Sequence, residues 1–320
     1  MGVEQVTDPV VYHGEGPVWH PGWGGLRFVD MLAGDIMTLA VGGSLERRHV
    51  GSVAAAVRPR RGGGAVIGME RGFALEDPDG TLTALPELWS DHRLRMNEGG
   101  CDPDGRFYCG SMAYDQSVGA ASVYRLDSDG FVEVVLDQVT VSNGLEWSPD
   151  GSRAYYNDTA TFTVSVFDYD TAAGLTNRRT FAELPDGGRP DGLTVDADGG
   201  VWTAVSNGGA VYRYSPAGVL EEKLPVPARK VTACTFGGEQ PRPAVHHHLA
   251  GEHRHPRGPA GRVPLPRRHR DQRTSGPPLR RLRATGQTFY RVSPGARSHD
   301  AGHGGHGRHG DHVGQFRRLF

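Results

Sequence analysis

Short apolar segments that run into Gly-rich turns recur six times along this chain of 320 residues. The copies begin 39 to 48 residues apart, at Gly16, Ala55, Gly99, Gly144, Gly192 and Ala233. A β-rich unit that repeats with a period of roughly 40 to 50 residues is typical of the blades of a propeller. We therefore predict an all-β fold, a six-bladed β-propeller in which the first strand of each repeat borders a central channel.

Polar residues recur at one position of these repeats. Four residues before the apolar residue that precedes each turn stand Glu15, Val53, Asn97, Asn143, Asp191 and Thr232. Side chains alternate along a strand, so equivalent positions of successive blades face the same way. Asn or Asp before Gly is also common in tight turns, which is the alternative interpretation of any one of these residues alone. Their shared position favours a common site in the channel.

The chemistry of these side chains indicates a hard cation. Two carboxylates and two carboxamides, without His or Cys, form an oxygen-donor set that suits Ca²⁺, Mg²⁺ or Mn²⁺. Zn²⁺ also accepts carboxylate oxygens, so ligand type leaves the ion open. We expect one divalent cation as cofactor.

Four segments resemble the SMP-30/gluconolactonase/regucalcin family of six-bladed propeller lactonases. They read GEGPVW at 14–19, RMNEGGCDPDGRFYCGSM at 95–112, SNGLEWSPDG at 142–151 and RPDGLTVDADG at 189–199. The resemblance covers roughly residues 10–240 and implies that the metal ligands are Glu15, Asn143 and Asp191. It also implies that Asp191 is the general base.

The same resemblance implies three substrate-binding residues, Arg95, Asn97 and Asp115. Asp115 departs from the family, which usually has Glu there, and its side chain is one methylene shorter. The family's N-D-G motif reads Asn97-Glu98-Gly99 in this chain. Asn provides both donor and acceptor groups, which suits the hydroxyls of a sugar.

The function that these residues indicate is a divalent-metal-dependent hydrolase that opens a sugar lactone. The metal would polarise the carbonyl as a Lewis acid, and Asp191 would activate water. Two alternatives stay open: a calcium-binding regulatory protein of the regucalcin type, and a phosphotriesterase-like hydrolase. The expected partner is a small-molecule sugar lactone, and the sequence leaves the oligomeric state open.

Other functional classes lack their motifs. The chain has no G-x-S-x-G elbow, no H-E-x-x-H and no GxxxxGK[ST] loop. Three cysteines, Cys101, Cys109 and Cys234, are too few and too odd in number for a disulfide framework, and we expect Cys101 and Cys109 to be buried thiols. No apolar run of 18 residues and no signal-peptide pattern occur, so we expect a cytoplasmic protein that does not bind membranes.

Charge divides the chain near residue 240. Residues 1–240 hold 19 basic and 33 acidic residues, a net charge of −14. Residues 241–320 hold 16 Arg and 4 acidic residues, a net charge of +12, and 11 of the 15 His. Only 12 of these 80 residues are Leu, Ile, Val or Phe, a composition typical of disorder. We predict a propeller domain at 1–240 and an Arg/His/Pro/Gly-rich tail at 241–320, disordered or frameshifted.

Three interpretations of residues 241–320 compete: a basic tail that binds nucleic acid or anionic membrane, a His-rich metal tract, and the product of a shifted reading frame. The third is favoured, which argues against a nucleic-acid partner. Codons for His246, His247 and His248, read one base later, permit the Ile-Thr-Thr that the family carries in its sixth blade. On this hypothesis the last blade is incomplete and the chain has weak activity.

Overall fold

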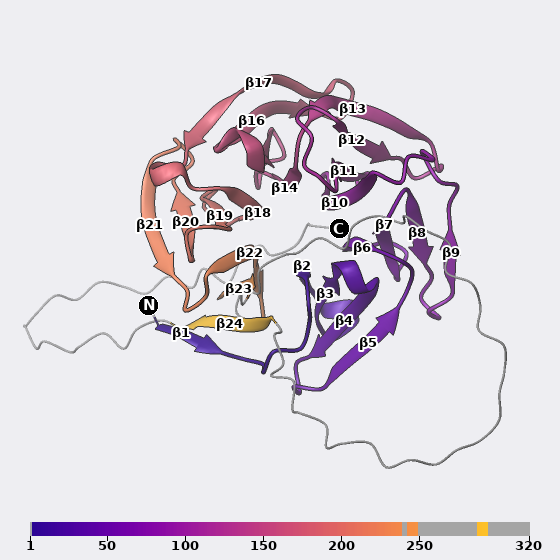
Figure 1. Cartoon of the computed structure of the whole chain (residues 1–320), viewed down its shortest axis with the longest axis horizontal. Coiled ribbons are helices and arrows are strands. Elements are labelled where there is room, and N and C mark those ends of the chain that lie inside the picture. Colours follow the sequence, from indigo (N-terminus) through magenta and orange to yellow (C-terminus); the bar gives the residue numbers. More distant parts are fainter. Residues whose placement is uncertain (1, 239–241, 249–286, 294–320) are drawn as a thin grey trace, which may run out of the picture.

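A computed structural model describes residues 2–238, 242–248 and 287–293. In this part of the chain the strands form antiparallel four-stranded sheets, and the helices are single 3₁₀ turns. Five sheets, each built from four consecutive strands, are arranged as the blades of a propeller around a central axis (Figure 1). The predicted all-β propeller is therefore confirmed for five blades. The 3₁₀ turns are η1 (Pro21–Trp23), η2 (Met31–Ala33), η3 (Thr159–Thr161) and η4 (Pro185–Gly187).

The blades follow one another along the chain, each from its inner to its outer strand. The first contains β2 (Gly14–His20), β3 (Gly25–Asp30), β4 (Asp35–Ala40) and β5 (Leu45–His49). The second contains β6 (Ala54–Pro59), β7 (Ala65–Met69), β8 (Phe73–Glu76) and β9 (Leu82–Ala84). The third contains β10 (Leu94–Cys101), β11 (Phe107–Ala113), β12 (Ala121–Leu126) and β13 (Val132–Val139).

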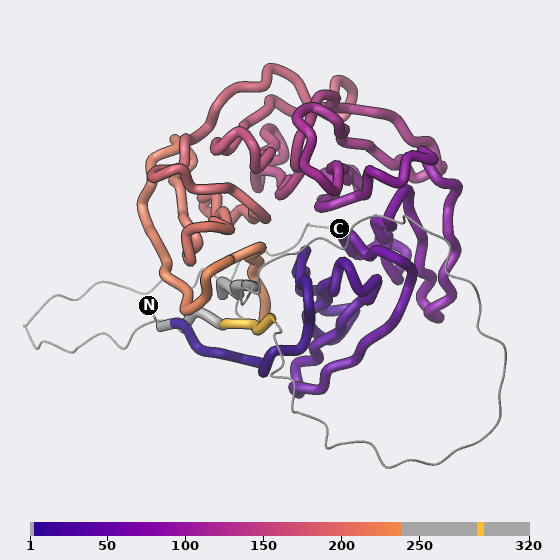
Figure 2. Tube along the Cα trace, viewed as in Figure 1, coloured from indigo at the N-terminus to yellow at the C-terminus, as the bar shows by residue number. Residues whose placement is uncertain are grey.

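Two further blades continue the same order. The fourth contains β14 (Ser142–Trp147), β15 (Arg153–Asp158), β16 (Thr163–Asp170) and β17 (Gly174–Glu183). The fifth contains β18 (Pro190–Val195), β19 (Val201–Val205), β20 (Ala210–Tyr214) and β21 (Leu220–Pro225). Figure 2 shows the trace advancing around the axis with the sequence, so residues distant in the chain meet at its centre.

A last sheet joins both ends of the described chain. It contains β22 (Lys230–Gly237), β23 (Arg242–His248), β24 (Thr288–Ser293) and β1 (Gly2–Gln5), in that order. Its inner strand contacts the first blade, since the Thr232 hydroxyl donates to the Gly14 carbonyl at 3.0 Å. Phe289 of β24 packs edge-on against Phe28 of β3, with ring centroids 4.2 Å apart.

The predicted boundary at residue 240 falls inside this last sheet. Strands β23 and β24 belong to the predicted tail 241–320, whereas residues 249–286 and 294–320 lie outside the described residues. The expected incomplete last blade and the expected tail therefore stay predictions.

Every inner strand changes register at the same place. The irregularity lies between Glu15 and Val18 in β2, between Met96 and Gly99 in β10, and at the equivalent points of the other four inner strands. A bulge bends its strand and re-aims the side chains beside it. The polar channel residues stand at these bulges, so the irregularity sets their direction.

Apolar residues fill the space between neighbouring blades. Trp147 of the fourth blade packs edge-on against Tyr108 of the third, with centroids 5.1 Å apart. Cys101 and Cys109 are buried free thiols, as predicted, and Cys234 is a buried free thiol as well. Among the described residues no helix has the length and apolarity needed to cross a membrane.

Candidate active site

The six residues of the predicted channel position are all buried. They are Glu15, Val53, Asn97, Asn143, Asp191 and Thr232, and the most exposed of them, Asp191, is 8% exposed. The inner strands that carry them contact one another in ring order, including β22 with β2. The structure therefore brings the polar residues of separate repeats to the centre of the molecule.

Hydrogen bonds connect the third, fourth and fifth blades across this centre. Arg95 Nη1 donates to Asn97 Oδ1 at 2.6 Å, and Asn97 Nδ2 donates to Asn143 Oδ1 at 3.0 Å. Asn143 Nδ2 in turn donates to the Thr159 hydroxyl at 2.6 Å, which donates to the Pro190 carbonyl at 2.7 Å. These bonds fix both amides in one orientation, because each amide nitrogen has a defined acceptor.

A hydrogen bond to its backbone carbonyl holds Asp191 in place. Its carbonyl accepts a hydrogen bond from Asn157 Nδ2 at 2.6 Å, and the same amide donates to the Thr203 hydroxyl at 2.9 Å. Burial raises the pKa of the Asp191 carboxyl, and the nearby charge of Glu98 raises it further. Asp191 is thus a buried carboxylate whose negative charge is not fully compensated by its protein neighbours.

Glu15 is the second buried carboxylate of the centre, and the charges of Asp191 and Glu98 act on it. Burial raises its pKa well above the ordinary value, with further contributions from the charges of Asp191 and Glu98. Its Oε1 lies 3.6 Å from His13 Nε2, whereas its buried Oε2 has no hydrogen-bond partner among the described residues. A buried carboxylate oxygen without a partner is costly, so the site has the character of a cation site.

The donor set fits a divalent cation. Glu15 and Asp191 offer carboxylate oxygens, and Asn143 offers an amide oxygen whose nitrogen is already engaged. In the described part of the chain no three His, Cys, Asp or Glu side chains gather as a metal site. A cation held by Glu15 and Asp191 would therefore also use the amide oxygen. We call Glu15, Asn143 and Asp191 the oxygen cluster. Oxygen ligands of this kind suit Ca²⁺, Mg²⁺ and Mn²⁺ best.

Arg95 borders the cluster and is itself buried. Burial lowers its pKa, while the charges of Tyr114, Glu15 and Asp191 oppose that shift. Its guanidinium lies over the Tyr114 ring, 5.7 Å from the centroid, and the Tyr114 hydroxyl donates to Glu70 Oε1 at 2.8 Å. Tyr114 and Glu70 hold the Arg95 guanidinium in position. Sequence reasoning missed both residues.

Asp115 lies apart from these bonds. It is exposed in the loop between β11 and β12, where its Oδ1 accepts hydrogen bonds from the Ser117 amide at 3.0 Å and hydroxyl at 2.7 Å. A short Asp side chain readily closes such a local turn. The structure thus brings five of the six predicted site residues together. The contact of Asp115 with a substrate stays a prediction.

Sequence reasoning also missed Glu98, Arg58 and Thr159. Glu98 Oε1 pairs with Arg58 Nη2 at 3.1 Å, and both side chains are largely buried. A signal for Glu98 was present, because the other five repeats have Gly or Ala at its position. No comparable signal marked Thr159, which follows the second strand of its blade.

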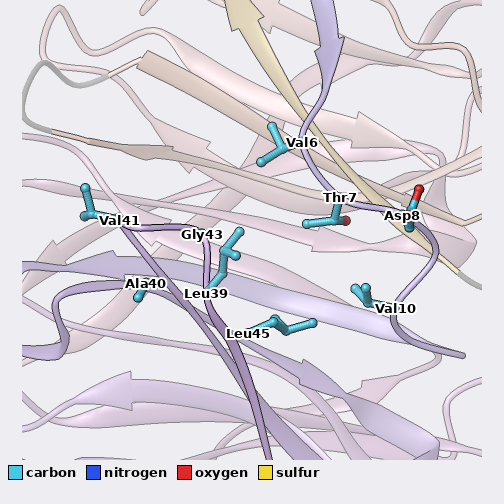
Figure 3. A pocket seen from close by; sticks show the side chains of 9 residues that line it. All are labelled: Val6, Thr7, Asp8, Val10, Leu39, Ala40, Val41, Gly43 and Leu45. Atoms are coloured by element: carbon cyan, nitrogen blue, oxygen red, sulfur yellow. The ribbon is translucent and has the colours of Figure 1, made fainter.

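The groove drawn in Figure 3 is a separate feature. Its walls come from the segment between β1 and β2 and from the β4–β5 hairpin, with Val6, Val10 and Leu39 among its side chains. None of the predicted site residues lines it. It therefore has no part in the chemistry of the buried centre.

Fold and site together define a β-propeller with a buried oxygen-donor centre. The model of the SMP-30/Gluconolactonase/LRE-like region matches residues 13–244, and the chain belongs to this family. It is 37% identical over 233 residues to a regucalcin of Danio rerio, covering 71% of this chain and 79% of the relative. It is 36% identical over 241 residues to pentonolactonase XacC of Haloferax volcanii, covering 74% and 82%.

Among solved structures, a calcium-binding regucalcin of Agrobacterium tumefaciens is similar in fold. Its TM-score is 0.72 at 26% identity, and the match covers 78% of this chain and 86% of that protein. The family thus includes both lactonases and calcium-binding proteins.

Proposed function

We propose that this protein is a divalent-cation-dependent hydrolase that opens sugar lactones. The observation that carries the proposal is the oxygen cluster, in which two buried carboxylates and an oriented amide oxygen lie beside Arg95 and Asn97. The kinship with a pentonolactonase supports the same substrate class. Glucono-, galactono- and arabinonolactone are the substrates to test, and the cation is Ca²⁺, Zn²⁺, Mg²⁺ or Mn²⁺.

Glu15, Asn143 and Asp191 would hold the cation. When bound, it would polarise the lactone carbonyl and acidify a water molecule. Asn97 and Arg95 would orient the substrate through its hydroxyls and ring oxygen, because both sit at the edge of the oxygen cluster with fixed side chains.

Asp191 would move the proton. Its carboxylate accepts a proton from the attacking water as the oxygen of that water bonds to the carbonyl carbon. The bond between this carbon and the ring oxygen then breaks, and Asp191 returns the proton to the leaving oxygen. The product is the open hydroxy acid, and no other reactant is needed.

Replacing Asp191 tests this assignment. Asp191→Asn keeps the side-chain shape and the backbone bond to Asn157 but removes the base, so turnover should fall about 10² to 10⁴-fold. Initial rates of lactone opening measure the loss. Asp198→Asn, an exposed position in the same blade, is the matched control and should keep full activity. Full activity of Asp191→Asn would show that the site is wrong.

A calcium-binding regulatory role is the second candidate, because a solved relative is described as a calcium-binding protein, regucalcin. Tight Ca²⁺ binding by this chain without turnover of any lactone would favour it.

We further propose that the propeller has six blades, that the sheet of β22, β23, β24 and β1 is the last of them, and that this blade is incomplete because the C-terminal quarter of the chain is atypical. The contacts of β22 and β24 with the first blade support the place of this sheet in the ring. The family match that ends at residue 244 supports a boundary near 240. A cytoplasmic location stays a prediction.

A further inference from the structure

Glu98 stands where the other inner strands have almost no side chain. The residue after the channel position is Gly16, Ala54, Gly144, Gly192 or Ala233 in the other repeats. In β10 it is a glutamate that is 4% exposed. A carboxylate at such a depth costs free energy unless charge or hydrogen bonds compensate it.

The first blade makes room for this side chain. Gly16 has φ of +53°, and a Cβ built on it would come within 3.3 Å of Glu98 Oε1 and 3.5 Å of Arg58 Nη1. Glu98 therefore reaches from β10 across to β2, beside the residue that follows Glu15. Its carboxylate therefore lies next to the backbone of the strand that presents Glu15 to the oxygen cluster.

Arg58 compensates this glutamate only in part. Arg58 Nη2 contacts Glu98 Oε1 at 3.1 Å, while its Nη1 donates to the Val57 carbonyl at 2.8 Å. The buried Oε2 of Glu98 has no hydrogen-bond partner among the described residues. One oxygen of the glutamate is thus paired and the other is left without compensation.

We propose that Glu98 is a positioning residue that raises the affinity of the oxygen cluster for a divalent cation, and that Arg58 moderates this effect. The inference rests on the proposed cation site. A third negative charge near Glu15 and Asp191 attracts a cation through a poorly screened interior. The positive charge of Arg58, which is paired with Glu98, weakens that attraction.

Calcium binding to the full chain, freed of divalent ions by a chelator, tests the proposal by titration calorimetry. Glu98→Gln keeps the shape and removes the charge, so the Kd for Ca²⁺ should rise about tenfold. Arg58→Gln leaves Glu98 unpaired, so the Kd should fall severalfold. Arg60→Gln is the matched control: it removes the same charge two residues away, from a more exposed pair with Asp77, and the Kd should stay unchanged.

Thermal unfolding without Ca²⁺ separates this role from a structural one. Both variants break the same ion pair and should destabilise the chain, whereas only the affinities should move in opposite directions. Equal affinities in all variants, or shifts in one direction, would overturn the inference while the cation site stands. If the unsubstituted chain binds neither Ca²⁺, Mg²⁺, Mn²⁺ nor Zn²⁺, the proposed site fails and the inference with it. Should Glu98→Gln fail to fold, a Kd for Arg58→Gln that does not fall overturns the inference alone.

Discussion

Arg95 shows how neighbouring residues fix one side chain of the proposed site. Its guanidinium bonds Asn97 and lies over the Tyr114 ring, and Glu70 fixes Tyr114 through the phenol hydroxyl. The hydrogen bond from Tyr114 to a carboxylate is of the charge-assisted kind. The ring therefore limits the positions that the Arg95 side chain can take.

Removing the Tyr114 hydroxyl should loosen this arrangement. In Tyr114→Phe we expect the KM for lactone to rise severalfold with little change in kcat, and stability to fall by about 1 to 2 kcal/mol. Steady-state kinetics and urea unfolding measure the two effects. Tyr12→Phe, at an exposed tyrosine, is the control. A KM identical to that of the unsubstituted chain would contradict the role given to Tyr114.

The residues at the channel position could be predicted because equivalent positions of successive repeats lie around the same centre of the fold. Glu15, Asn97, Asn143 and Asp191 follow from that rule alone. The direction of the Asp115 side chain could not be predicted. A motif gives a residue's place in the chain but does not show which local turn its side chain hydrogen-bonds to. Glu98 escaped because only the bulge brings a second consecutive side chain into the buried centre.

At the scale of elements, the turn between β18 and β19 shows how a blade keeps its shape. Asp196 Oδ1 accepts from the Gly200 amide at 2.7 Å, and its Oδ2 accepts from Trp202 Nε1 and Arg213 Nε, each at 2.8 Å. Burial acts to raise the pKa of Asp196, but the bonds from Arg213, Trp202 and Gly200 outweigh it and lower the pKa. The ionised carboxylate thus stabilises the blade that carries Asp191.

This shift predicts an acid-dependent stability. A carboxyl whose pKa is lowered by folding contributes stability above its unfolded pKa of about 3.9, and loses that contribution as pH falls through the folded pKa. The difference in unfolding free energy between the unsubstituted chain and Asp196→Asn should therefore shrink below about pH 4. Urea unfolding from pH 7 to pH 3 measures it. A difference that stays constant over this range would contradict the account.

At the scale of the whole molecule, the ring depends on its last sheet. Strands β22 and β1 come from the acidic part of the chain, and β23 and β24 come from the Arg- and His-rich part. A propeller needs this sheet to cover the facing sides of its first and fifth blades. The distance from Glu15 to Asn143 and Asp191 depends on that closure, because Glu15 belongs to the first blade.

The reading-frame hypothesis predicts a one-base shift within codons 236–250 of the DNA that encodes this chain. Sequencing that segment tests it. A corrected frame should encode an Ile-Thr-Thr strand and a Gly-rich sixth blade, and the corrected protein should be more stable and more active. A confirmed frame would contradict the hypothesis, and residues 241–320 would then have to be tested as a working part of this protein.

Lactone opening by the full chain with and without divalent cations is the measurement that tests the central claim most directly. The account predicts that glucono-, galactono- or arabinonolactone is opened in the presence of the cation. It also predicts that a chelator abolishes the reaction and that Ca²⁺, Zn²⁺, Mg²⁺ or Mn²⁺ restores it. Undiminished turnover by the chelated chain, or cation binding with no turnover of any lactone, would contradict it.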